Sequence, residues 1–212
     1  MAVPAPTRPA PTPVLIFDIG NVFVRHDNNL LFDRLAACCA DPVGVRPRLA
    51  AGLHDNVIAT GRLGIDALHG QLVAEHGFSQ PYGHFLDLWS SHFSEEPGME
   101  ALVRVLAQRH RIALFSNINA PHWEHVSARY TALAHAHAAY LSYQLGLVKP
   151  DPASFRRVLE LEGCAPEDSI FIDDRAENTA AATSIGMRSV TFTDRAALVT
   201  ALAAYGVATE GL

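Results

Sequence analysis

The sequence predicts an α/β protein in which helices flank a parallel sheet, and three observations support this prediction. Short apolar runs recur along the chain, and each ends in polar residues, which is typical of buried parallel strands. Helical patterns lie between these runs, and such alternation is typical of right-handed crossovers onto a parallel sheet. A long segment after the first run contains only helical patterns, so we expect a small helical insertion there.

The chain before the first strand differs in composition from the rest. Residues 1–13 hold five prolines and little that could pack in a core, so we expect a disordered, Pro-rich arm. Order is expected to begin with the apolar run at residues 14–17, which leads into a loop that starts at Asp18. Burial on both faces explains why this run is continuous rather than alternating.

The segment after the first strand is too long for one crossover. A βαβ unit takes about 30 residues, whereas Ser116, at the end of the next strand, lies 98 positions beyond Asp18. Apolar residues here recur every three or four positions, at residues 30–39, 47–53, 65–76 and 82–93, which favours helices. We therefore expect residues 27–94 to form an α-helical cap domain, and residues 14–26 and 95–212 to form the core domain.

Further apolar runs predict the remaining strands of a Rossmann-like sheet. They lie at residues 112–115, 138–141, 169–172 and 189–192, and helical patterns lie at residues 99–110, 152–161 and 177–185. In open sheets of this kind, ligands bind beyond the carboxyl ends of the strands. Asp18, Ser116 and Asp174 are therefore expected to lie close together.

Composition argues against several classes of protein. Lys and Arg total 16 against 22 Asp and Glu, so the formal charge of −6 makes nucleic acid an unsuitable general partner. No apolar run approaches the roughly 18 residues of a membrane helix, and no secretory signal pattern is present, so we expect a cytoplasmic protein without a membrane partner. The three cysteines and eleven histidines lack the spacing of a disulfide framework or a zinc site. Oligomeric state is left open.

Polar residues end or follow the predicted strands in the order Asp18, Ser116 and Asn117, Lys149, and then Asp173 and Asp174. This order resembles the haloacid dehalogenase-like superfamily, in which an aspartate nucleophile follows the first strand and a serine or threonine follows the second. A lysine and an acidic pair come next in that pattern. The resemblance runs from residue 14 to about residue 193.

The resemblance assigns the nucleophile to Asp18, an ionised carboxylate that attacks phosphorus and forms an aspartyl-phosphate, which water later hydrolyses. A phosphate ester brings nearly two negative charges towards Asp18 and Asp174, and unit charges 4 Å apart repel by about 4 kcal/mol at an effective dielectric of 20. Mg²⁺ and Lys149 together offset this charge. We therefore expect Asp18, Asp174 and the backbone carbonyl of Gly20 to be metal ligands. Asp173 is expected to lie next to these ligands without binding the metal itself.

Ser116 and Asn117 are expected to offer a hydroxyl, an amide and backbone N–H groups to the phosphoryl oxygens, together with Lys149. Each residue also has a simpler interpretation. Asp18 and the acidic pair could cap turns, Lys149 could be a solvated surface charge, and Asn117 or Asn119 could only cap the next helix. The order of all four groups along the chain outweighs these alternatives.

Gly20 departs from typical phosphatases of the superfamily, which carry a second aspartate at this point as general acid and base. His26 lies nearby in the sequence, but a surface histidine is its simpler interpretation, and Arg25 is a weak candidate for contact with the leaving group. Residues 17–21, 116–119, 145–150 and 171–174 resemble the bacterial YihX-like branch most, which includes α-D-glucose-1-phosphate phosphatase. That branch also lacks the second aspartate.

The sequence thus predicts a magnesium-dependent phosphomonoester hydrolase that acts on a small phosphorylated metabolite, with sugar phosphates as one candidate class. Two alternatives stay open. In a metal-free 2-haloacid dehalogenase, Asp18 would attack carbon instead of phosphorus, but the acidic pair would then have no metal to bind. A non-catalytic phosphate-binding regulatory protein would explain the missing acid, but it gains nothing from holding a carboxylate against an anion.

Overall fold

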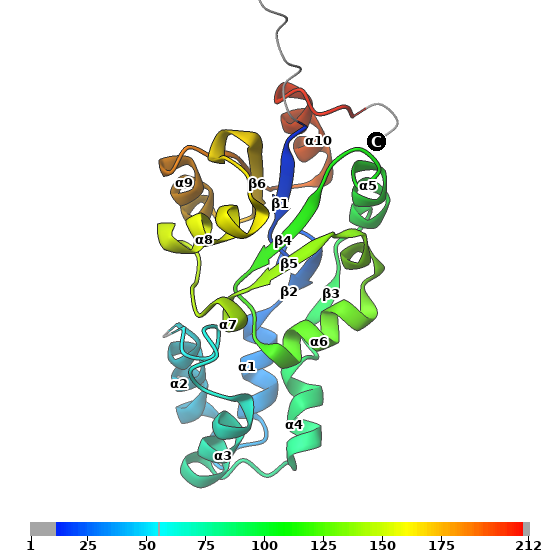
Figure 1. Cartoon of the computed structure of the whole chain (residues 1–212). Helices are drawn as coiled ribbons and strands as arrows, with labels where there is room; N and C mark the ends of the chain where they lie inside the picture. The colour runs from blue at the N-terminus through cyan, green and yellow to red at the C-terminus, as the bar shows by residue number, and fades with distance from the viewer. Residues whose placement is uncertain (1–11, 55, 210–212) are drawn as a thin grey trace, which may run out of the picture.

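A five-stranded sheet forms the centre of the molecule, and all of its neighbouring strands are parallel (Figure 1). The computed structural model describes residues 12–54 and 56–209, so the expected Pro-rich arm falls almost entirely outside the described residues. From edge to edge the strands are β5 (Ala138–Leu141), β4 (Ile112–Ser116), β1 (Val14–Phe17), β6 (Ser169–Asp173) and β7 (Arg188–Thr191). The predicted α/β class with a parallel sheet is confirmed.

Helices cover both faces of the sheet, which is why its strands are apolar throughout. One face packs on α5 (Met99–Leu106), α6 (Ala120–Arg129) and α10 (Arg195–Ala204), and the other packs on α8 (Pro152–Glu162) and α9 (Ala176–Ser184). Strand β1 shows the alternation, because Leu15 and Phe17 join the first cluster whereas Ile16 joins the second. Three short helical segments complete this part: η1 (Thr131–His135), α7 (Ser142–Leu145) and η2 (Pro166–Asp168).

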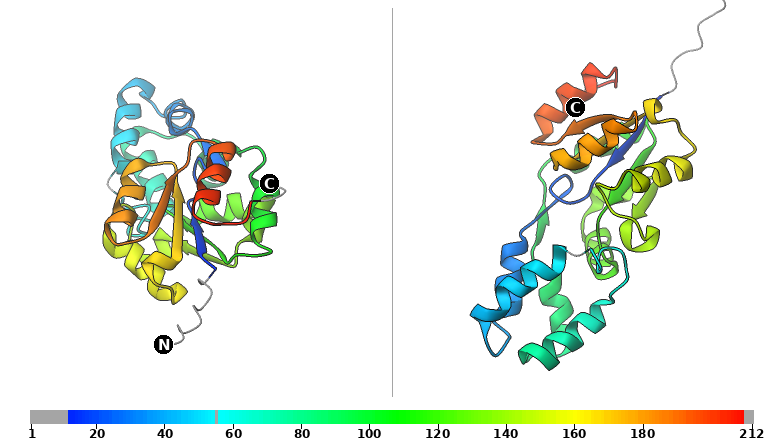
Figure 2. Two further views of the ribbon diagram at one scale, coloured as in Figure 1. Left: turned by 90° about the horizontal axis from the view of Figure 1, so that it is seen from above. Right: turned by 90° about the vertical axis from the view of Figure 1, so that its left-hand side faces the viewer.

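The segment after β1 forms a separate helical lobe beyond the carboxyl ends of the strands (Figures 1 and 2). Its helices are α1 (Asn28–Ala36), α2 (Pro42–His54), α3 (Ile65–His76) and α4 (Tyr82–Trp89). A hydrophobic cluster of its own holds these helices together, with Leu31, Leu35, Leu72, Phe85 and Trp89 among its fully or nearly fully buried members. We use the name cap for residues 27–92.

A two-stranded antiparallel ribbon joins the cap to the sheet domain. It pairs β2 (Val24–His26) with β3 (Phe93–Glu95). The predicted helix at residues 82–93 is therefore too long, since α4 ends at Trp89 and the chain turns through Ser90 and Ser91. Pairing with β2 explains the difference, because it holds the backbone of Phe93 in an extended conformation. No local sequence pattern predicts such a pairing. No helix within residues 12–54 and 56–209 is long and apolar enough to cross a membrane.

Candidate active site

The residues expected to act together meet at the carboxyl ends of β1, β4 and β6, facing the cap. Asp18 follows β1, Ser116 ends β4 and Asp174 follows β6. Together with Lys149 they line a cavity of about 470 Å³, which we call the active-site cavity. Cap residues close its other side: Asn28, Leu31, Asn56, Ile58 and Ala59.

Lys149 is the electrostatic centre of this group. Its side chain is only 1% exposed, and its Nζ lies 2.9 Å from Asp18 Oδ1 and 2.6 Å from Asp173 Oδ2. The same ammonium group lies 5.3 Å and 5.4 Å from the ring centres of Phe115 and Phe171. A buried lysine is costly unless it is paired, and the two carboxylates and the aromatic rings offset this cost.

Asn117 holds the backbone of Lys149. Its Nδ2 donates to Lys149 O over 2.8 Å, and Lys149 N donates to its Oδ1 over 2.9 Å. This pair of bonds fixes the loop between α7 and α8 against the end of β4. The Asn117 amide is thus engaged with Lys149, and because Asn117 also lines the active-site cavity, its contact with a phosphoryl group stays a prediction. Ser116 is buried and lines the active-site cavity as expected.

Asp173 is fully buried and saturated with hydrogen-bond donors. Its carboxylate accepts from Lys149 Nζ, from Arg175 N over 2.9 Å and from Asn178 Nδ2 over 2.9 and 3.0 Å. Burial raises the pKa of Asp173 while Lys149 opposes this shift. With its oxygens engaged in this way, Asp173 is suited to orient Lys149, in line with the supporting position expected from the sequence.

Asp18 and Asp174 are better placed to bind a cation. Each of the carboxylates of Asp18, Asp173 and Asp174 offers an oxygen, and these oxygens lie within 4.8 Å of one another. Asp18 Oδ1 is buried and has no hydrogen-bond partner among the described residues, since its contact with Lys149 lacks hydrogen-bonding angles. Asp174 Oδ2 accepts a single bond, from Asn21 Nδ2 over 2.9 Å. Such a set of oxygen donors fits Mg²⁺.

The loop after β1 brings His26 against Gly20. A Cβ on residue 20 would lie 3.0 Å from both Cδ2 and Nε2 of the His26 ring, so the imidazole occupies the space where a side chain at residue 20 would extend. His26 is half-buried and lines the active-site cavity, which corrects its interpretation as a surface histidine. Gly20 also lines this cavity.

Asn21 is a site residue that the sequence reasoning missed. It has a φ of 52°, a left-handed conformation that asparagine tolerates better than most residues. This turn lets its amide donate to Asp174 while its Oδ1 accepts from His26 N over 3.3 Å. The Gly-Asn pair after the strand is a turn signal that could have indicated it.

Asn119, His122 and Trp89 join the cap to the sheet domain beside the active-site cavity. Asn119 is the N-cap of α6, accepting from His122 N over 3.1 Å, and it also accepts from Trp89 Nε1 over 3.3 Å. His122 Nε2 lies 3.0 Å from Trp89 O, and the two rings stack with centres 5.0 Å apart. Of the two asparagines considered as caps, Asn119 is the one that caps this helix.

Two histidines of this region are held neutral. Burial lowers the pKa of His92 to about 4, and the nearby His26 adds to the shift. Burial likewise lowers the pKa of His122 to about 3, with His92 as the next cause. Arg25, the weak candidate for contact with the leaving group, is instead exposed and pairs with Glu96 over 3.0 Å.

A parallel sheet that gathers an aspartate, a buried lysine and an acidic pair beneath a helical lobe defines the haloacid dehalogenase-like class of α/β hydrolases. The family model for haloacid dehalogenase-like hydrolases matches residues 15–186, so the chain belongs to this family.

Two curated relatives match parts of the chain. Drimenol cyclase from Aspergillus calidoustus is 37% identical over 82 residues, which are 39% of this chain and 16% of that protein. Flavin mononucleotide hydrolase 1 from Arabidopsis thaliana is 33% identical over 123 residues, which are 55% of this chain and 48% of that protein. The chain therefore spans less than half the length of either relative.

Solved structures share the fold. A HAD family enzyme from Bacteroides thetaiotaomicron superposes with a TM-score of 0.78 at 20% identity, covering 86% of this chain and 94% of that chain. The same enzyme has also been crystallised in complex with magnesium and inorganic phosphate.

Proposed function

We propose that this protein is a magnesium-dependent phosphomonoester hydrolase that acts on a small phosphorylated metabolite through an aspartyl-phosphate on Asp18. The observation that carries the proposal is the meeting of Asp18, Lys149 and Asp174 in one cavity that the cap covers. Sugar phosphates, the substrates expected from the YihX-like branch, are the first class to examine.

The arrangement explains how an anionic phosphate ester would approach the anionic carboxylate of Asp18. Lys149 lies between Asp18 and Asp173, so one positive charge faces the nucleophile before any substrate arrives. Asp18, Asp174 and the carbonyl of Gly20 would hold Mg²⁺, which supplies positive charge to the phosphoryl oxygens when bound. Ser116 would donate its hydroxyl to the same oxygens, in the manner of a preorganised site for developing charge.

Asp18 itself is the attacking group. Asp18 forms a bond from a carboxylate oxygen to phosphorus, and the bond from phosphorus to the leaving oxygen breaks. Water then attacks the phosphorus, releases inorganic phosphate and returns Asp18 as a carboxylate. Because residue 20 is glycine, it has no side chain to donate a proton to the leaving oxygen, so the leaving oxygen takes its proton from solvent and the attacking water returns one to the solvent.

The comparisons support this proposal at the level of the family. The Bacteroides enzyme with the same fold was crystallised with magnesium and inorganic phosphate, and the Arabidopsis relative is a flavin mononucleotide hydrolase, as its name states. A metal site at Asp18 and Asp174 would also argue against the dehalogenase alternative, since that reaction proceeds without a metal. The oxygen donors around Asp18 and Asp174 therefore favour phosphate chemistry.

A direct test uses purified protein and 4-nitrophenyl phosphate, with and without Mg²⁺. We expect phosphate release that requires Mg²⁺ and that disappears in Asp18→Asn, a variant that keeps the shape of the side chain. Chloride release from 2-chloropropionate without metal would instead support the dehalogenase. Equal, slow phosphate release by wild type and Asp18→Asn, without any chloride release, would contradict both enzymatic functions and favour a phosphate-binding protein.

A further inference from the structure

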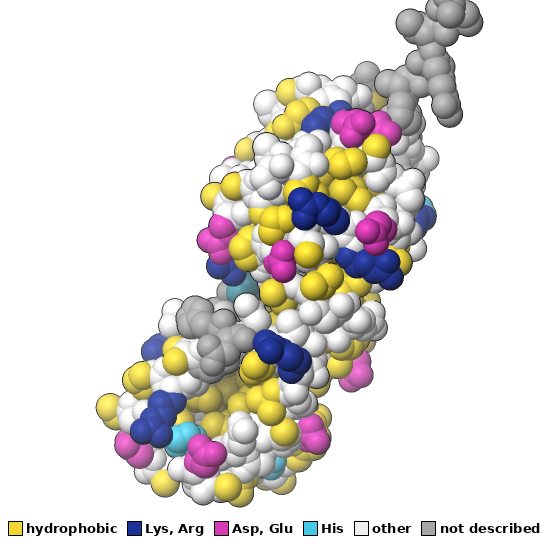
Figure 3. All heavy atoms as spheres, turned by 60° about the vertical axis from the view of Figure 1, so that its left-hand side comes forward, with side chains coloured by type: hydrophobic (Ala, Val, Ile, Leu, Met, Phe, Trp, Pro, Cys, Tyr) yellow, Lys and Arg dark blue, Asp and Glu magenta, His cyan; other side chains and the backbone are white. Residues whose placement is uncertain are grey.

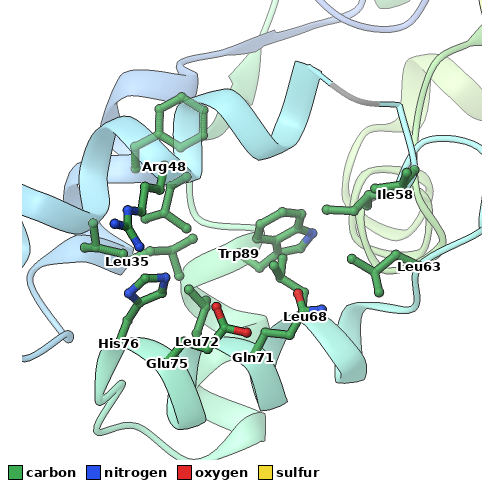
Figure 4. Close-up of a pocket in the computed structure, with 14 residues that line it drawn as sticks. Leu35, Arg48, Ile58, Leu63, Leu68, Gln71, Leu72, Glu75, His76 and Trp89 are labelled. Atoms are coloured by element: carbon green, nitrogen blue, oxygen red, sulfur yellow. The ribbon is translucent and has the colours of Figure 1, made fainter.

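The cap contains a second cavity, separate from the active-site cavity and different in character. It has a volume of about 260 Å³ and lies among the cap helices (Figure 4). Its walls are mostly aliphatic and aromatic, with Leu35, Ile58, Leu63, Leu72 and Trp89 among them. Figure 3 shows hydrophobic side chains gathered in a hollow on the surface of this lobe. We call it the cap cavity.

The cap cavity and the active-site cavity share a wall. Ile58 lines both of them. Trp89 lines the cap cavity, while its ring stacks on His122 and its Nε1 donates to Asn119, both of which line the active-site cavity. At Ile58, which lies between α2 and α3, one side chain therefore faces both cavities.

The two ends of the cap cavity differ in polarity. Arg48, Glu75 and His76 lie together at one end, whereas Ile58 and Leu63 lie at the opposite end (Figure 4). The polar residues also line a further hollow on the outside of the cap. The apolar end thus borders the active-site cavity, and the polar end faces away from it.

The size of the cap cavity is large for a packing defect. A water molecule takes about 30 Å³ in the liquid, protein interiors contain few voids larger than one water, and apolar cavities of this kind bind apolar molecules in preference to water. The core of the cap away from this cavity is well buried, with Leu31 and Phe85 at 0% exposure. A space of this volume beside a phosphate site is therefore suited to part of a ligand.

We propose that the cap cavity is the subsite for the leaving group of the substrate, and that the substrate is a phosphate monoester with an aliphatic hydrocarbon group. This inference rests on the proposed phosphatase function. The phosphate lies at Asp18 and Lys149, the chain of the alcohol passes Ile58, and its hydrocarbon end packs against Leu63, Leu68 and Trp89. Purely polar sugar phosphates would leave this cavity empty.

The test compares phosphate release from ethyl, butyl, hexyl and octyl phosphate. Each methylene buried in an apolar site strengthens binding about fourfold, so kcat/KM should rise by up to about that factor per methylene until the cavity is full. Leu68→Trp should fill the cavity from α3 and bring octyl phosphate down to the level of ethyl phosphate. The readout is the ratio of kcat/KM for octyl phosphate to kcat/KM for ethyl phosphate within each protein.

Val73→Trp is the matched control, because Val73 is on the same helix, is 44% exposed and does not line the cap cavity. It should keep the dependence on chain length. If Leu68→Trp does not fold, Leu63→Phe reduces the same cavity from the loop before α3 and replaces it in the comparison.

The outcomes separate this inference from the proposed function. Equal kcat/KM for all four alkyl phosphates in wild type would overturn the subsite while leaving the phosphatase intact. If no ester is hydrolysed, the phosphatase function is contradicted, and the binding of 1-octanol is measured by calorimetry to test the apolar site. Binding to wild type and Val73→Trp but not to Leu68→Trp then supports the apolar site. Octanol binding that is equal in all three proteins, or absent from all, would overturn the subsite.

Discussion

Replacing Lys149 by methionine tests the electrostatic account of the site most directly. Lys149 is the cation that lies between Asp18 and Asp173, and its side chain is 1% exposed. Methionine keeps the length and apolar stem of the side chain but removes the charge. Asp18 and Asp173 would then be close together and unpaired, one of them fully buried.

The structure lets the size of this effect be worked out. Removing one partner of a buried ion pair costs about 3 to 5 kcal/mol, because the other charge stays buried without compensation. Lys149 compensates two carboxylates whose side chains are 10% and 0% exposed, so we expect a loss of about 4 kcal/mol in the free energy of unfolding at pH 7 without added metal. For a chain of this length, that corresponds to a fall in Tm of about 8 to 16 °C.

Urea unfolding followed by circular dichroism measures this change. Arg157→Met is the control for loss of a surface pair, since Arg157 and Glu160 are 50% and 65% exposed and such pairs contribute less than about 1 kcal/mol. Asp18→Asn leaves the contact of Lys149 with Asp173 in place and should change stability by less than about 1 kcal/mol, although activity is lost.

The pH dependence gives a second readout. Burial already raises the pKa of Asp173, and the loss of Lys149 removes the cation that opposes this shift. The cost of Lys149→Met should therefore shrink as the pH falls and Asp173 takes up a proton. A Lys149→Met protein within 1 kcal/mol of wild type at pH 7, or one whose deficit grows in acid, would refute the reasoning.

Three further predictions follow from the same region. Mg²⁺ at about 100 times its dissociation constant should stabilise wild type by about 2.7 kcal/mol in thermal unfolding but should hardly affect Asp174→Ala, and equal stabilisation of both proteins would exclude Asp174 as a ligand. Acid should destabilise the protein: the unfolded chain takes up protons on His92 and His122 near pH 6.5, whereas the folded chain does so only near their pKa values of about 4 and 3. Stability is then complete above pH 6.5 and falls by up to about 1.4 kcal/mol per pH unit for each histidine, and a flat urea profile between pH 7 and 5 would contradict this. Gly20→Ala should displace the His26 ring, because the new Cβ would lie 3.0 Å from it. We expect a loss of about 1 kcal/mol in the free energy of unfolding and a shifted His26 signal in NMR spectra, and an unchanged signal would contradict the contact.

Much of the architecture could be predicted from the sequence because it depends on local patterns. Apolar runs bounded by polar residues located the strands of the sheet, and β7 (Arg188–Thr191) differs by one position from its predicted range. The segment after Asp18 was expected to contain helices, and α1 to α4 lie there. The grouping of Asp18, Ser116 and Asp174 followed from the rule that parallel strands share their carboxyl ends.

Several contacts join residues that are distant in the sequence, so no local sequence pattern could predict them. The strand at Phe93–Glu95 exists because it pairs with β2, and the packing of His26 against Gly20 follows from that ribbon. The two hydrogen bonds between the Asn117 side chain and the Lys149 backbone join segments 32 positions apart.

The sequence by itself determined the fold class, the family resemblance and the chemical types of the site residues, since these follow from periodicity, strand ends and the order of polar groups. Only the tertiary structure decided which of those groups face one another: that Lys149 lies between Asp18 and Asp173, and that the cap contains an apolar cavity next to the site. Those features arise where separate elements pack together, and their geometry depends on side-chain volumes from the whole chain rather than on any one segment.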